Sequence, residues 1–182
     1  MITWLLYSHY TSDDHQLLNQ NTDKGREVDN QSLMKLKMER SLVLIKPDAM
    51  QRELAGTIIT RLEKPGLKLV ALKMLHLDKA LARRHYAIHK DKPFFNNLVD
   101  YISSSPIVAV VFEGEGAIAV IREIMGATDP AKAKAGTIRG DFGLDIERNT
   151  IHGSDSVETA EEEIKLFFSE DEIFNYRKEI DG

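Results

Sequence analysis

One short segment of the chain, Asn149 to Ser156, combines a histidine with glycine, serine and aspartate. Because Gly153 adds no side-chain bulk, the backbone beside His152 can turn sharply and the imidazole can face an open cleft. The two serines and the aspartate that follow are well suited to cap a helix. An incidental histidine in a helix-start turn is therefore the competing explanation.

The helix expected over Ser156–Phe168 supplies a carboxylate for this histidine. Glu163 lies three residues after Ala160 and four before Phe167, so it shares the apolar, inward-facing line of that helix. Burying an unpaired charge is costly, and His152 is the candidate partner. A carboxylate on one ring nitrogen fixes the tautomer and leaves the other nitrogen free as a nucleophile.

Three basic residues stand at breaks in the apolar periodicity. Lys46 ends the first apolar run, Arg122 lies in a predicted helix, and Arg139 lies between Gly136 and Gly140. Fixed cations of this kind suit phosphoryl transfer, because negative charge spreads over the equatorial oxygens of the transferred group. Each residue taken singly is more often a surface residue, so only their convergence in the fold would be specific.

The common nucleotide and metal signatures are missing from the chain. There is no G-x-x-x-x-G-K-[ST] loop, and Gly114 and Gly116 are not followed by the third glycine of a dinucleotide fingerprint. His85 and His89 have the i, i+4 spacing of a metal pair, but the glutamate of H-E-x-x-H and an evident third ligand are absent. Any nucleotide binding must therefore use a different binding motif. A metal enzyme with His85 and His89 as ligands is the weaker alternative.

Composition indicates one globular domain that stays in the cytosol. The 182 residues are 42% hydrophobic and 29% charged, and there is no cysteine. The lack of cysteine excludes disulfides and thiolate chemistry and fits a reducing compartment. The net charge of -5 argues against a general nucleic-acid-binding surface. No run approaches the roughly 20 apolar residues that cross a bilayer, so we expect a soluble, cytoplasmic protein without membrane or nucleic-acid partners.

The apolar patterns predict an α+β sandwich, with an antiparallel sheet and helices on one side. In the second expected strand, Leu69, Ala71 and Leu75 should share one face. The expected strands are residues 42–45, 67–77 and 107–112, with a fourth short strand in the loop region of residues 127–149. The expected helices are residues 54–62, 79–89, 94–103, 116–125 and 156–168.

The N-terminal region differs from the rest, and we expect an extension over residues 1–37 and a folded domain over residues 38–182. The apolar start, Ile2–Tyr7, is too short for a signal-peptide core. The polar stretch from Thr11 to Gln31 has little periodicity. Either the extension is loosely ordered or it is a start-site artefact, with translation beginning at Met38.

Five motifs resemble those of nucleoside diphosphate kinases, in family order and at family spacing, from about Glu39 to the end of the chain. The motif around His152 is the most specific of them. The five motifs are Lys46-Pro47-Asp48, His85-Tyr86-x-x-His89-Lys90 with Lys92-Pro93-Phe94-Phe95, Gly126-Ala127-Thr128-Asp129-Pro130, Gly136-Thr137-Ile138-Arg139-Gly140-Asp141-Phe142 and Asn149-x-x-His152-Gly153-Ser154-Asp155-Ser156.

The resemblance implies a ferredoxin-like α+β fold and a ping-pong reaction. His152 would take the γ-phosphoryl group from a nucleoside triphosphate, chiefly ATP, and pass it to a nucleoside diphosphate. Mg²⁺ would bridge the phosphates, with a water-mediated contact to Asp155. Members of the family form tetramers or hexamers, so the resemblance also implies a homo-oligomer.

The same resemblance assigns roles to further residues. Lys46 and Asn149 would contact the ribose 3′-hydroxyl, and Lys46 would also hold the transferred phosphate. Tyr86 would line the site, while Ser154 and Glu163 would orient His152. Phe94 would hold the base on one side and Ile146 on the other. The phosphates would be held by Arg122, Thr128 and Arg139.

The chain departs from the family pattern at two further places. Ile88 stands where the family usually has an acidic residue, and the chain ends at Gly182, slightly short of the usual aromatic and acidic tail. The second departure bears on subunit contacts more than on chemistry. The alternative function is a non-catalytic regulatory or binding protein on the same fold, with partner contacts in the extension or around Pro130. Loss of a catalytic residue would favour that alternative, and none is lost.

Overall fold

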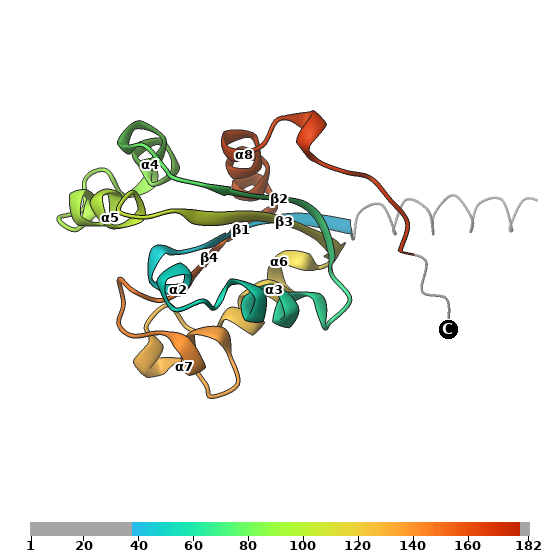
Figure 1. Ribbon diagram of the computed structural model, residues 1–182, viewed down its shortest axis with the longest axis horizontal. Helices are drawn as coiled ribbons and strands as arrows, with labels where there is room; N and C mark the ends of the chain where they lie inside the picture. The colour runs from blue at the N-terminus through green and yellow to red at the C-terminus, as the bar shows by residue number, and fades with distance from the viewer. Residues whose placement is uncertain (1–37, 179–182) are drawn as a thin grey trace, which may run out of the picture. The chain divides into compact units, whose positions relative to one another are not determined.

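The computed structural model describes residues 38–178, so the expected extension over residues 1–37 lies outside the described residues. Four antiparallel strands form one sheet in the order β2-β3-β1-β4 (Figure 1). This arrangement confirms the expected α+β class. The strands are β1 (Met38–Ile45), β2 (Lys68–Leu75), β3 (Ile107–Glu115) and β4 (Ile151–Gly153).

The helices cover both faces of the sheet, so the expectation of helices on one side is wrong. Figure 1 shows α4, α5 and α8 on one face and α2, α3, α6 and α7 on the other. The helices are α2 (Pro47–Gln51), α3 (Ala55–Glu63), α4 (Lys79–His85), α5 (Phe95–Ile102), α6 (Ala117–Met125), α7 (Ile138–Phe142) and α8 (Val157–Phe167). Short 3-10 turns are η1 (Ala87–His89), η2 (Pro130–Lys132) and η3 (Glu170–Glu172).

The central strand β1 explains the two-sided cover. Leu42 and Leu44 are buried in the core beneath α4, α5 and α8, whereas Val43 and Ile45 are buried in the core on the opposite face. Successive side chains of a strand point to opposite faces, so an uninterrupted apolar strand needs packing partners on both sides. The fully apolar run that identified the strand therefore also required a second layer of helices.

A β-bulge in β2 changes which residues share a face. The register with β3 shifts between Leu69 and Ala71. As a result Leu69 packs with the core of α3 and α6, while Ala71 and Leu75 pack with the opposite core. The expectation that these three residues share one face is wrong, because the extra residue of a bulge reverses the alternation.

The region that was expected to be one long loop contains a helix, α7, and ends just before β4. The fourth strand therefore lies immediately after residues 127–149 rather than within them. Among the strands within residues 38–178 it pairs with β1 alone, where His152 lies opposite Leu44. His152 thus sits on an edge strand of the sheet. Among residues 38–178, no helix combines the length and the apolarity needed to cross a membrane.

Candidate active site

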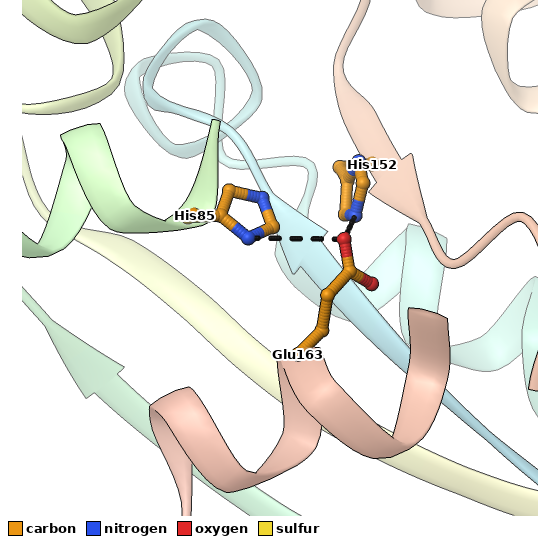
Figure 2. A group of neighbouring side chains, drawn as sticks. All are labelled: His85, His152 and Glu163. Carbon is orange, nitrogen blue, oxygen red and sulfur yellow. Dashed lines mark hydrogen bonds and ion pairs between the residues drawn. The ribbon is translucent and has the colours of Figure 1, made fainter. Parts of the chain in front are cut away.

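His152 is held by a buried carboxylate from the neighbouring helix. Its Nε2 lies 2.8 Å from Oε1 of Glu163 (Figure 2). The Ser154 hydroxyl donates to the other carboxylate oxygen, Oε2, at 2.6 Å. An ionised carboxylate can only accept hydrogen bonds, so Nε2 of His152 carries the proton and Nδ1 is the unprotonated nitrogen. The helical spacing predicted this contact between Glu163 and His152, and the structure contains it.

Backbone strain lies two residues before the histidine. Thr150 is fully buried and has a φ of 69°. This left-handed conformation is rare for a β-branched residue and is often found where the surrounding structure holds a functional site. Its carbonyl accepts a hydrogen bond from the backbone N–H of Lys46 at 2.8 Å. The strained residue therefore joins the start of β4 to the end of β1.

Lys46 and Asn149 form a buried pair in the same corner. The Lys46 Nζ donates to Oδ1 of Asn149 at 2.7 Å. The Asn149 Nδ2 donates to the carbonyls of Thr128 at 3.0 Å and Ile146 at 3.1 Å. Burial, together with the positive charge of Arg139, lowers the pKa of Lys46 to about 8. The pair places a cation of near-neutral pKa beside the start of β4.

Arg139 is a second buried cation, tied to two backbone carbonyls. It donates to the carbonyl of Ile151 at 2.9 Å and to that of Gly126 at 3.1 Å. Burial and the nearby charge of Arg122 lower the pKa of Arg139 to about 10. Arg139 therefore lies close enough to both Lys46 and Arg122 for their charges to interact. The three basic residues, Lys46, Arg122 and Arg139, therefore lie near one another in the fold.

A small polar pocket opens between the end of α6 and the start of α7. Arg122, at its mouth, is exposed and forms an ion pair with Asp155. The backbone of the pocket bends at Gly126, which has a φ of 78°. The lining residues are Arg122, Met125, Gly126, Ala127, Thr128 and Arg139. Three of the sequence-predicted residues, Arg122, Thr128 and Arg139, are thus brought together.

The aromatic and apolar candidates lie in different surroundings. Tyr86 is buried, and its ring centroid lies 6.4 Å from that of His152. Burial and the charge of Glu163 raise the pKa of Tyr86, so its hydroxyl remains a neutral donor. Phe94 is 49% exposed and Ile146 is 67% exposed. Both therefore offer apolar surface to a ligand from outside.

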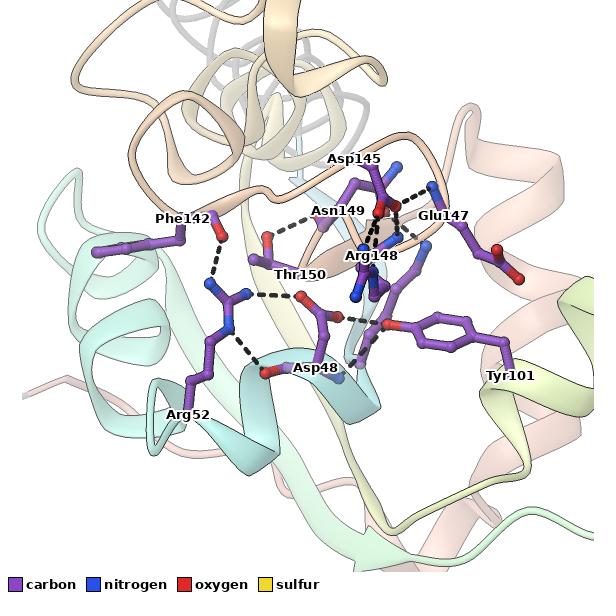
Figure 3. Close-up of polar contacts among 10 residues, drawn as sticks. Asp48, Arg52, Tyr101, Phe142, Asp145, Glu147, Arg148, Asn149 and Thr150 are labelled. Atoms are coloured by element: carbon purple, nitrogen blue, oxygen red, sulfur yellow. Dashed lines mark hydrogen bonds and ion pairs between the residues drawn. The ribbon is translucent and has the colours of Figure 1, made fainter.

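A network around Asp48 was missed by the sequence analysis, apart from the place of Asp48 in the Lys-Pro-Asp motif. Asp48 accepts hydrogen bonds from the hydroxyl of Tyr101 and from Arg52, the latter at 2.6 Å (Figure 3). Arg52 also donates to the carbonyl of Phe142 at 2.7 Å. Burial and the bond to Asp48 raise the pKa of Tyr101. The network joins α2, α5 and the end of α7, and no local signal marks Arg52 or Tyr101.

The structure changes the set of residues that could hold a metal ion. Within residues 38–178, the group of possible metal ligands that includes His85 contains His152 and Glu163, with ligand atoms within 4.8 Å of one another. His89 is not in this group, so the His85–His89 pairing is wrong. His89 instead stacks on Tyr86, with a centroid distance of 6.5 Å.

Fold and site together define an α+β phosphotransferase in which an oriented histidine lies beside buried cations. The family model described as nucleoside diphosphate kinase matches residues 39–173. A nucleoside diphosphate kinase of Dehalococcoides mccartyi is 59% identical over 139 residues, covering 76% of this chain and 98% of that protein. One of Archaeoglobus fulgidus is 59% identical over 141 residues, covering 78% of this chain and 93% of that protein. The chain belongs to the nucleoside diphosphate kinase family.

Solved structures agree with this assignment. A halophilic nucleoside diphosphate kinase from Halobacterium salinarum, in complex with CDP, superposes with a TM-score of 0.75 at 50% identity, covering 77% of this chain and 93% of that chain. The enzyme from Aquifex aeolicus superposes with a TM-score of 0.74 at 44% identity, covering 75% and 99%. The chain is therefore an enzyme that transfers phosphoryl groups between nucleotides, which sets aside the purely regulatory alternative.

Proposed function

We propose that His152 is the nucleophile of a ping-pong nucleoside diphosphate kinase reaction and is phosphorylated on Nδ1. The Nδ1 lone pair attacks the γ-phosphorus of a triphosphate, ATP above all, and the bond to the bridging oxygen breaks. A β-phosphate oxygen of a second diphosphate then attacks the phosphorus, and the nitrogen–phosphorus bond breaks. The observation that carries this proposal is the 2.8 Å contact of Nε2 with Glu163, which leaves only Nδ1 free.

The cations around the pocket are proposed to hold the phosphates. The ion pair of Arg122 with Asp155 is exposed, and such pairs contribute little, so a phosphate can replace the carboxylate. Two buried donors, the Tyr86 hydroxyl and Nε of Arg139, have no protein partner among the described residues. Buried donors of this kind fit an anionic ligand. Arg122, Arg139 and Thr128 would grip the phosphates, with Tyr86 beside the transferred group.

The sugar and base are proposed to lie over the neighbouring surface. Lys46 and Asn149 would contact the ribose 3′-hydroxyl, with Lys46 also reaching the transferred phosphate. Phe94 would stack on one face of the base and Ile146 would pack on the other. Every base has a π-face, so stacking explains the use of many nucleotides. The CDP bound by the Halobacterium relative supports a nucleoside diphosphate as the acceptor.

We propose Mg²⁺ as the divalent cofactor. Asp155, which is highly exposed, forms an ion pair with Arg122 of the pocket lining. Mg²⁺ usually keeps several waters and is bound through one or two carboxylates plus substrate phosphates, so this donor set fits a water-mediated contact. When bound, the ion would neutralise charge on the phosphates. Asp155 would help to hold it, which would leave Arg122 free for the nucleotide.

We further propose a cytoplasmic homo-oligomer, either a tetramer or a hexamer. The support is the outer edge strand β2, on which Leu72 is 49% and Met74 is 63% exposed. Exposed apolar side chains on an edge strand suit contact with a second copy. The absence of cysteine fits the cytoplasm.

Labelling tests the central role of His152. The wild-type protein, incubated with γ-labelled ATP and Mg²⁺, should gain an acid-labile, alkali-stable label, and His152→Ala should gain none. The control is His76→Ala, which changes an exposed histidine outside the pocket and should label like wild type. Label on His152→Ala would refute the assignment. A coupled assay of GDP conversion to GTP would show the second half-reaction.

A further inference from the structure

His85 is a buried histidine next to the proposed nucleophile, and it has no role in the reaction proposed for His152. Its ring packs edge-on against that of His152, with centroids 4.7 Å apart, and also contacts the rings of Tyr86 and Phe167. Its side chain has no exposed area. Neither of its ring nitrogens has a hydrogen-bond partner among the described residues.

Packing alone does not account for a histidine at this position. A buried polar group without a partner destabilises a protein, because it loses its hydrogen bonds to water and gains none. Phenylalanine would make the same edge-to-face contacts with no such cost. A residue whose type costs stability where an apolar one would fit is a candidate for function.

The geometry indicates which group His85 serves. Its Nδ1 lies 3.8 Å from Oε1 of Glu163, the oxygen that accepts the hydrogen bond of His152. Figure 2 shows this oxygen between the two imidazole rings. The distance exceeds a hydrogen bond, but a shift of less than one ångström would make one.

His85 is suited to donate one N–H hydrogen bond to this oxygen. Burial, with the neighbouring charges of His152 and Lys46, lowers the pKa of His85 well below its usual value. The ring is therefore neutral and carries one N–H. Its neutrality also matters for His152, because a second positive ring 4.7 Å away would oppose a developing imidazolium.

We propose that His85 is a positioning residue that holds the Glu163 carboxylate while His152 is phosphorylated. The proposal rests on the proposed function of His152. As phosphorus bonds to Nδ1, the His152 ring becomes cationic and its Nε2–H depends more strongly on Glu163. A second donor on Oε1 keeps that oxygen in place. A metal ion between the same three groups is disfavoured, because Nε2 and Oε1 already bond to each other and Lys46 and Arg139 lie nearby.

The test compares His85→Phe, which keeps the aromatic packing, with His85→Gln, which keeps a donor. In His85→Phe we expect a higher melting temperature, a kcat about tenfold lower and an unchanged KM, because positioning acts in the transition state. In His85→Gln we expect kcat to be at least partly restored. His76→Phe controls for the same exchange outside the site and should match wild-type kcat.

Nitrogen NMR of the His152 ring gives a readout that packing alone would not move. In wild type we expect the Nε2–H tautomer, and in His85→Phe a measurable share of the Nδ1–H tautomer. Wild-type kcat in His85→Phe, or a lower melting temperature for it, would overturn the inference. If wild type itself is not labelled on His152, the proposed function fails. If wild type is labelled normally on His152 and His85→Phe keeps the wild-type kcat, this inference alone fails.

Discussion

The buried lysine beside the start of β4 should make the proposed reaction sensitive to mildly alkaline pH. Burial and Arg139 lower the pKa of Lys46 to about 8, whereas the pKa of Arg139 is lowered only to about 10. Lys46 is therefore charged at pH 7 and loses its charge as the pH rises through 8. Between pH 7 and pH 9 its charged fraction falls from about 0.9 to about 0.1.

If Lys46 must be charged to receive a phosphate, kcat/KM should fall about tenfold over this range. The parameter kcat/KM reports the free enzyme, where the low pKa applies; bound phosphate raises the pKa, so kcat should change less. The assay is pre-steady-state labelling of His152 with MgATP at several ATP concentrations, because adenine has no ring proton that titrates between pH 7 and 9.

Two variants decide whether Lys46 is responsible. Lys46→Arg keeps a cation at every pH tested, so its profile should be flat between pH 7 and 9. Lys46→Met should be slow and equally flat. A tenfold fall that persists in Lys46→Arg would refute the reasoning, since another group would then be titrating.

The same titration affects stability with the opposite sign. The folded-state pKa of Lys46 lies below the ordinary lysine value of 10.5, so the unfolded state binds more protons between these two pH values. The contribution of Lys46 to the free energy of unfolding therefore increases as the pH rises from about 8 to about 10.5. Urea denaturation of wild type and Lys46→Met should show this difference.

Two further predictions concern binding and the network around Asp48. Phe94→Ala should raise KM for every nucleotide by roughly 5- to 160-fold, as expected for loss of about 1–3 kcal/mol of stacking; steady-state assays with GDP, CDP and UDP check it, and an effect on only one base would contradict it. Tyr101→Phe removes a donor from the buried Asp48 carboxylate and should lower the free energy of unfolding by about 1–3 kcal/mol. Urea denaturation measures the second change, and an unaltered midpoint would show that Arg52 alone satisfies Asp48.

Local patterns predicted most of the helices and strands, though not α2 or α7, and one contact of the site. The uninterrupted apolar runs located β1 and β3, because such runs in short segments bounded by turns are typical of buried strands. The contact of Glu163 with His152 was predictable because Glu163 lies on the inward-facing line of α8, where spacing in the sequence converts directly into geometry, and His152 in β4 precedes that helix by only a few residues. The position of Glu163 on the helix face could be predicted from neighbouring residues alone.

Contacts between distant parts of the chain were not predictable in this way. The pairing of Lys46 with Asn149 joins residues 103 positions apart, and their proximity follows from β1 and β4 being neighbours in the sheet. The bulge at Val70 has no local mark, since both registers of β2 bury apolar side chains. The second layer of helices was implied by β1 but was missed. This missed layer contains α7, which brings Arg139 close to β4. The side chain of His152 in β4 faces the opposite layer, formed by α4, α5 and α8.

The two carbonyl contacts of Arg139 have a consequence for variation in the chain. Its guanidinium joins the end of α6, at Gly126, to β4, at Ile151. The distance between Arg139, which is proposed to bind phosphate, and His152, the proposed nucleophile, is therefore set by the sheet and by these two hydrogen bonds. The turn from Pro130 to Gly136 lies outside that linkage. The turn is nevertheless tied to α7, because the Thr137 hydroxyl donates to the Lys134 carbonyl at 2.6 Å and the Gly136 N–H donates to Asp141 at 2.8 Å. Its exposed side chains can therefore change more easily than its length.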